Sequence, residues 1–334
     1  MAGRRNRNKK CDHYSGIGGQ AVIEGVMMKN KDRYAVAVRT PDQDINVAVE
    51  EYRSFGGDGI LKKIPFIRGV FVFVDSLILG VKTLNYSASF YEEEELRKNR
   101  RQKKKLIDRI LGDKAESILT GLTVLFSIVL AVAVFMLLPY LIAEFFRRFI
   151  ISEMVIALIE GISRLLIFIL YLLLISLMND IKRTFMYHGA EHKCINCIET
   201  GNALTVDNVM QASRQHKRCG TSFMFLVVFV SIVLFMFIRA EEPILRLAIR
   251  ILLIPVISGI SYEIIRLAGR YDNFLIRFIS APGMFLQKLT TREPDREMAE
   301  VAIASVEAVF DWREYLLKEF GIEIPYEEEV DYYA

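Results

Sequence analysis

The 334-residue chain lacks several features that mark common classes of soluble and secreted protein. Its formal net charge is only +3, so we do not expect the chain as a whole to bind nucleic acid or another polyanion. Cys11–Gln20 is polar and rich in glycine where a secretory signal peptide would have its apolar region, so no such signal is expected. No internal repeat is present, and no low-complexity tract lies outside the charged ends. The class of the protein must therefore be inferred from its apolar blocks.

Histidine and cysteine are scarce, with four of each. Membrane di-iron hydroxylases use His-x-x-x-His boxes but need many more histidines, which excludes that class. The glycines of residues 16–19 and Gly25 are not followed by a Gly-Lys-Ser/Thr ending and a helix, which excludes a phosphate-binding loop. In a reducing cytoplasm the thiols are expected to be free to bind a metal rather than paired in disulfides.

Apolar residues make up 52% of the chain, and the excess is concentrated in four long blocks. A helix of about 20 apolar residues crosses the hydrocarbon core of a bilayer. Two blocks are uncharged, whereas the other two contain acidic and basic residues that must pair or face a bundle interior. We therefore expect an α-helical membrane protein with a four-span bundle, although one of the charged blocks could be a re-entrant or interfacial helix. The expected spans are residues 117–143, 151–178, 219–238 and 244–265.

Charged residues within the second and fourth blocks are expected to pair. Glu160 and Arg164 are four residues apart and share a helix face. By topology Glu160 and Arg250 both lie toward the outer half of the bilayer, where they can face one another. Such a pair either fixes helix register or lines a small translocation path.

Lys and Arg residues predict the orientation of the bundle. They gather in the stretch before the first span, where Lys103–Lys105 lie, and between the second and third spans. The loops on the opposite side of the membrane hold few. The positive-inside rule then places both termini and the 179–218 loop in the bacterial cytoplasm.

The remaining segments are expected to be cytoplasmic. Residues 1–15 form a basic tail, and residues 16–60 form a β-rich domain with a hairpin whose turn is at Pro41-Asp42. Residues 61–116 contain a charged linker and an apolar helix, either amphipathic on the membrane face or buried under the β domain. Residues 271–334 form a C-terminal segment with an amphipathic docking helix over 294–320.

Three of the four histidines and three of the four cysteines fall between His188 and Cys219. His188-Gly-Ala-Glu191-His192 has the inverted zincin pattern, in which two imidazoles bind zinc and the glutamate acts on a water molecule. Both histidines share a face if the preceding helix continues. A third ligand is needed, and the candidates are Glu199, His216, Cys219 and Glu263.

A second pattern overlaps the first. Cys194-x-x-Cys197 and His216-x-x-Cys219 have the spacing of a structural zinc site with all four positions filled. A catalytic site would instead keep one position open for water. Without a metal, these side chains would only hydrogen-bond the loop to lipid headgroups or to neighbouring helices.

Four blocks resemble the YqhQ-like family of uncharacterised bacterial membrane proteins, predicted to be metal-dependent enzymes. They are residues 18–28 (GGQAVIEGVMM), 188–193 (HGAEHK), 218–223 (RCGTSF) and 289–294 (LTTREP). The resemblance spans residues 15–310 and implies a site built from His188, His192 and Cys219, with Glu191 and His216 nearby. Cys194 and Cys197 are not part of the family pattern, which disfavours the four-ligand zinc finger. The resemblance also implies a role for Gln20 and Glu24.

The sequence thus predicts a multi-pass protein of the bacterial inner membrane with a divalent metal, zinc, at the cytoplasmic face. The first hypothesis is a metal-dependent hydrolase of a membrane-associated substrate, in which Glu191 is the general base. A second is a non-catalytic scaffold or a membrane-protein biogenesis factor with a structural metal site. A third is a small transporter. The expected partners are the lipid bilayer and either another membrane protein or a second copy of the chain.

Overall fold

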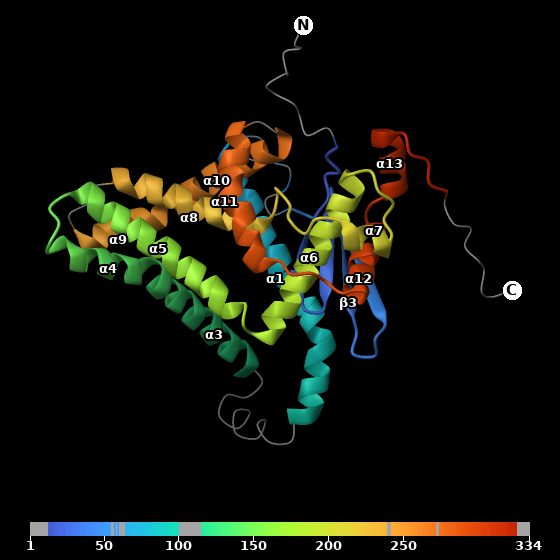
Figure 1. The fold of residues 1–334 in the computed structure, drawn as a ribbon. Coiled ribbons are helices and arrows are strands. Elements are labelled where there is room, and N and C mark those ends of the chain that lie inside the picture. The colour runs from blue at the N-terminus through green and yellow to red at the C-terminus, as the bar shows by residue number, and fades with distance from the viewer. Residues whose placement is uncertain are drawn as a thin grey trace, which may run out of the picture.

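The computed structural model describes residues 13–54, 57, 59, 64–99, 115–238, 242–271 and 274–325. Within these residues the chain forms an α/β unit and a helical bundle that pack side by side (Figure 1). The basic residues 1–10, the run Lys103–Lys105 and the acidic residues 326–331 lie outside the described residues.

A small antiparallel sheet forms the centre of the α/β unit. Its strands follow one another in the order β1-β2-β3-β4. The hairpin that the sequence predicts is present, because β3 pairs with β4 and Tyr34 lies opposite Glu50 across the turn at Pro41-Asp42. The strands are β1 (Gly18–Val22), β2 (Gly25–Asn30), β3 (Arg33–Arg39) and β4 (Ile45–Glu51).

Helices cover both faces of this sheet. Tyr34 and Val38 belong to a core that also contains Leu79 of α1 (Ile67–Asn99). Val26 and Met28 face the opposite side and pack with α6 and α12. Because both faces are buried, β2 and β3 are apolar on both sides instead of alternating with polar residues. The helices on the second face are α6 (Asn179–Glu199), α7 (Val206–Gln211), α12 (Arg296–Glu307) and α13 (Trp312–Phe320).

Three segments differ in detail from their sequence-based descriptions. Of the two alternatives for residues 64–84, the packing of α1 on the sheet favours the helix under the β domain. The stretch 179–218, expected as a loop, is helical over α6 and α7. The single helix expected over 294–320 is two helices, because the Asp311 carboxylate accepts a hydrogen bond from the Glu314 N–H (2.9 Å) and caps a new one.

Two helices of the bundle are long and apolar enough to cross a membrane: Leu125–Arg147 and Glu153–Ile175. The third predicted span is a shorter apolar helix, and the fourth is broken at Leu253, where Pro255 follows and removes a backbone donor. The bundle consists of α3 (Ala115–Val132), the π-helical turn η3 (Ala133–Leu137), α4 (Leu138–Arg147), α5 (Glu153–Ile175), α8 (Gly220–Phe237), α9 (Pro243–Leu252) and α10 (Ile254–Arg270).

The charged pairs predicted from the sequence are present inside the bundle. Glu160 accepts hydrogen bonds from Arg164 (2.8 Å) and from Arg250 of α9 (2.7 Å). All three side chains are buried. A buried carboxylate with two guanidinium partners fixes the register of α5 against α9, because separating the partners would leave a charge unpaired.

Helix α11 (Phe274–Thr290) was not foreseen as part of the bundle. It packs against the beginning of α8, where Gly283 lies against Ser222 and Gln287 donates to the Ser222 hydroxyl (2.9 Å). The segment after residue 270 therefore turns back onto the bundle before the chain continues into the α/β unit.

A pair of glycines brings α1 against α10. A Cβ atom on Gly259 would lie 2.5 Å from the carbonyl oxygen of Phe66, and one on Gly69 would lie 2.9 Å from the Cα of Gly259. Small residues let two helix backbones approach closely, as at helix crossings in membrane proteins. This contact joins the helix under the sheet to the bundle.

We expect Gly259→Leu to destabilise the protein by about 1–3 kcal/mol, because the new side chain has no space between the two backbones. The thermal unfolding midpoint in detergent measures this loss. Val256→Leu is the matched control, since Val256 lies on the same helix and is exposed. Equal midpoints for the two variants would contradict the close crossing.

Candidate metal centre

Three of the predicted ligands come together at the junction between the α/β unit and the bundle. His188 and His192 lie one turn apart on α6, and Cys219 is the residue that caps the N-terminus of α8. One nitrogen of each imidazole and the Cys219 sulfur all lie within 4.8 Å of one another. His188 Nε2 is 3.1 Å from Cys219 Sγ. This His-His-Cys group has the composition and spacing to hold a metal ion.

Backbone carbonyls orient both imidazoles. His188 Nδ1 is 2.8 Å from the carbonyl oxygen of Thr290, and His192 Nδ1 is 2.7 Å from that of Arg214. A carbonyl oxygen can only accept, so each Nδ1 carries a hydrogen. Each Nε2 therefore faces the group, and it offers a lone pair to a metal once the ring is neutral. Histidines that bind metals usually donate their second N–H to a carbonyl or carboxylate in this way.

Cys219 lies where a thiolate is favoured. It precedes the first turn of α8, and its sulfur accepts a hydrogen bond from the Thr221 N–H (3.3 Å). A helix N-terminus and adjacent imidazoles stabilise the thiolate, which is the form that binds metals. Burial lowers the pKa of the His188 imidazole, but the neighbouring sulfur of Cys219 raises it overall, to about 10.

Glu191 lies beside this group in an unusual state for a carboxylate. It is 5% exposed, and the backbone N–H of Gly19 in β1 donates to it. A Cβ atom on Gly19 would come within 3.0 Å of the Glu191 side chain, so glycine lets the strand approach. Among the described residues, Glu191 Oε2 has no hydrogen-bond partner. Burial raises the pKa of the Glu191 carboxyl, although both histidines lower it in part.

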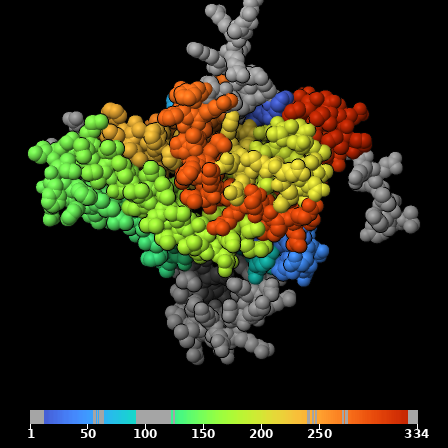
Figure 2. All heavy atoms as spheres, viewed as in Figure 1, coloured from blue at the N-terminus to red at the C-terminus, as the bar shows by residue number. Residues whose placement is uncertain are grey.

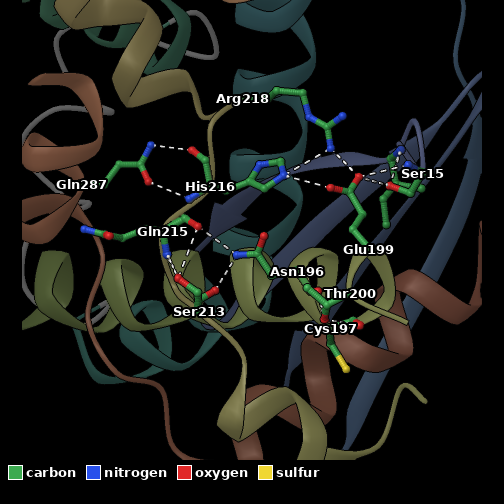
Figure 3. Close-up of polar contacts among 11 residues, drawn as sticks. Ser15, Asn196, Cys197, Glu199, Thr200, Ser213, Gln215, His216, Arg218 and Gln287 are labelled. Atoms are coloured by element: carbon green, nitrogen blue, oxygen red, sulfur yellow. Dashed lines mark hydrogen bonds and ion pairs between the residues drawn. The ribbon is translucent and has the colours of Figure 1, made fainter. Parts of the chain in front are cut away.

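His216 is adjacent to the group but belongs to a second network (Figure 3). Its Nε2 lies 3.5 Å from Glu199, which also binds the Arg218 guanidinium and the Ser15 hydroxyl. Burial raises the pKa of Glu199, but His216 and Arg218 lower it to about 2. The side-chain amide of Gln287 binds the backbone of His216 twice. Its Oε1 accepts from the His216 N–H (2.9 Å), and its Nε2 donates to the His216 carbonyl (2.7 Å). The ring centroids of His216 and His192 are 5.7 Å apart.

The other candidate ligands lie elsewhere. Cys194 and Cys197 are buried in the core beneath the sheet, and burial raises the pKa of Cys197 to about 11. Glu24 accepts hydrogen bonds from Arg183 (2.5 Å) and Tyr187 (3.3 Å), both on α6. Glu263 forms a two-pronged ion pair with Arg68 of α1. The structure does not bring any of these four into the His-His-Cys group.

The four sequence blocks that carry the family resemblance meet at this junction. The first contributes Gly19, the second the two histidines, the third Cys219, and the fourth the Thr290 carbonyl. The fourth block also packs closely on α6, because a Cβ atom on Gly189 would lie 2.0 Å from the carbonyl oxygen of Arg292. Residue chemistry alone did not identify Gly19, Thr290 or Gln287, since they act through a backbone group or an amide. Gly19 and Thr290 lie inside the blocks that resemble the family, and that resemblance was the only feature of the sequence that could have identified them.

Comparison with known proteins identifies a family. Residues 64–312 match the family described as "Protein of unknown function (DUF1385)". The chain is 35% identical over 293 residues to "Uncharacterized protein YqhQ" of Bacillus subtilis (strain 168), which covers 86% of this chain and 90% of that protein. No solved structure matches the chain. The chain therefore belongs to the DUF1385 family of YqhQ-like proteins.

Proposed function

We propose that the protein is a zinc-dependent hydrolase of the bacterial inner membrane that acts on a membrane-associated substrate. The observation that carries this proposal is a three-ligand His-His-Cys group next to a buried carboxylate with one unpartnered oxygen. The membrane, the metal and the reaction are each supported by different features.

Four membrane spans are supported by the packing of the bundle. Helices α8 and α9–α10 lie beside the two long apolar helices, and α8 is apolar throughout. Large apolar side chains are exposed along α3–α4 and α5, including Phe126 (67% exposed) and Leu166 (60%). Such surfaces are rare in soluble proteins but suit contact with lipid. The Lys/Arg distribution supports a topology with both termini in the cytoplasm.

Zinc is supported by the chemistry of the ligands. It binds imidazole nitrogen at about 2.0–2.1 Å and thiolate sulfur at about 2.3 Å in tetrahedral sites. These bond lengths place the nitrogen and sulfur about 3.5 Å apart. The observed 3.1 Å between His188 and Cys219 is close to that separation, so a small adjustment of side chains suffices. Three protein ligands leave a fourth position open, as in catalytic zinc sites.

Hydrolysis is supported by Glu191. A bound zinc ion supplies Lewis acidity and lowers the pKa of water. The carbonyls of Thr290 and Arg214 hold the two histidines so that their Nε2 atoms would face a bound ion. Glu191 would be the general base, because it lies among His188, His192 and Cys219 and has a buried oxygen that no described residue binds. The site lies at the end of the bundle, which suits a substrate held at the membrane surface.

A structural zinc site is the second candidate. Its support is that the ligands come from two units, with both histidines on α6 and Cys219 at the start of α8. The network of Glu199, His216 and Arg218 spans the same junction. A metal here would pin the α/β unit to the bundle, and the protein would act as a membrane scaffold or biogenesis factor without chemistry of its own.

We expect about one zinc ion per chain in protein purified without chelators. Elemental analysis of the detergent-solubilised protein measures it. Cys219→Ala and His188→Ala should lose the ion, since each removes one of three ligands. Cys197→Ala is the matched control, because that thiol is buried in the core and should keep the metal. Metal-free wild type, or zinc retained in Cys219→Ala, would overturn the metal centre.

We expect Glu191→Gln to lower hydrolysis by about 10²–10⁴-fold, because the amide cannot act as a base. The assay is release of product from chromogenic ester, amide and phosphoester substrates in mixed micelles. Zinc content and melting midpoint should stay unchanged.

The control for this experiment is Glu199→Gln, which changes a second, partly buried glutamate on α6 that contacts Arg218 instead of the His-His-Cys group. It should retain activity. If Glu191→Gln hydrolyses as fast as wild type, or if zinc-loaded wild type hydrolyses none of the substrates, the structural role is favoured over the hydrolase.

A further inference from the structure

Helix α11 has an apolar face whose large side chains are mostly exposed. Its large side chains on that face are among the most exposed in the protein, at 86% for Phe274, 62% for Leu275, 70% for Phe278 and 64% for Phe285. These positions share one side of the helix, because they recur at intervals of three, four and seven residues. In Figure 2 the orange and orange-red atoms of α10 and α11 lie on the surface between the green bundle and the yellow part of the α/β unit.

The opposite face of α11 is fixed by packing. Gly283, Gln287 and Thr290 all contact the first turn of α8, at Ser222 and Thr221. Leu286 of α11 also belongs to a cluster against which Phe225 and Val228 of α8 pack. Helix α11 therefore contacts the first turns of α8, near the beginning of that helix, as Figure 1 shows.

Helix α11 also contacts α5 and α10 at this end of the bundle. Leu286 packs with Phe168 and Leu172, close to the end of α5. Ile279 lines a small cavity with Ile265 and Ala268, close to the end of α10. The end of α5, the beginning of α8 and the end of α10 lie at one end of the bundle, which is the cytoplasmic end in the proposed topology. Because α11 contacts all three of these helix ends, it lies across that end of the bundle.

We propose that α11 is an in-plane membrane helix whose phenylalanine face is inserted into the headgroup boundary of the cytoplasmic leaflet. The inference rests on the membrane topology of the proposed function. A helix that lies in the plane of the interface buries an apolar face containing Phe and Leu and keeps Lys and Arg near the headgroups. Arg277 and Lys288 are exposed on α11 and meet that description. The spans that adjoin α11 also expose large apolar side chains, which is why lipid is the occupant.

This placement sets the depth of the candidate metal centre. Thr290 ends α11, and its carbonyl holds His188. The centre then lies at the level of the lipid headgroups. The membrane-associated substrate of the proposed hydrolase would then be a lipid, or a peptide segment, whose scissile bond lies at the level of the headgroups.

Tryptophan quenching by brominated lipids tests the proposal in proteoliposomes of the full chain. The protein has one tryptophan, Trp312, which is buried in the α/β unit and gives a constant background. Phe278→Trp should lose most of its added emission in phosphatidylcholine brominated near the headgroup, and less when the bromine is near the chain end.

Two further variants separate the possible outcomes. Leu166→Trp places an exposed tryptophan on the span α5 and should be quenched by brominated lipid. Leu317→Trp places an exposed tryptophan on α13, far from the spans, and should not be quenched. Quenching at 166 without quenching at 278 would overturn the in-plane helix while leaving the spans intact. Such a result would point to a second copy or a protein partner on this face. Stronger quenching at 278 by deep than by shallow bromine would overturn it too, since α11 would then insert deeply. No quenching at 166 would overturn the membrane topology itself.

Discussion

A buried imidazole needs a partner for each ring nitrogen, and this requirement fixes how α6 sits against the rest of the molecule. His188 and His192 meet it in the same way, with Nδ1 donating to a backbone carbonyl and Nε2 facing the Cys219 sulfur. The two carbonyls come from different segments, one before α8 and one at the end of α11. A shift of α6 by one residue would break both hydrogen bonds together. The register of α6, and with it the position of the sheet, thus depends on these two rings.

The packing around the junction leaves little freedom for alternative arrangements. Gly189 lets the chain near Arg292 lie directly on α6, and Gly19 lets β1 lie over Glu191. Lys193, which is buried, donates to the carbonyls of Met210 and Ala212. Glu191 differs from Lys193, because one of its buried carboxylate oxygens has no hydrogen-bond partner among the described residues. An unpaired buried carboxylate oxygen costs stability, and a water molecule beside a metal is the partner that would remove this cost.

Much of this arrangement follows from helix periodicity, and the rest from contacts that no local pattern encodes. His188 and His192 lie on one face because they are four residues apart, whereas Cys197 is about 180° around the helix from His188 and must face the core. Glu199 shares the face of His188 but lies about 16 Å further along the axis, too far to be a ligand of the same ion. The β hairpin and the ion pairs of Glu160 also follow from spacing. By contrast, Cys219 reaches the histidines through long-range packing, and the contact of α11 with α8 depends on Gly283, so neither follows from local patterns.

The position of the three side chains would couple metal binding to the docking of the two units, in the catalytic and in the structural role alike. A ligand that binds only the folded arrangement stabilises that arrangement. Two donors belong to the α/β unit and one to the bundle, so the binding free energy acts on the contact between them. The carbonyl of Thr290 adds the last turn of α11 to the same linkage. Coupling of this kind is reciprocal, so in the proposed arrangement the insertion of α11 into lipid and the occupancy of the centre would favour each other. A metal site at the surface of one unit would have no such connection to the membrane.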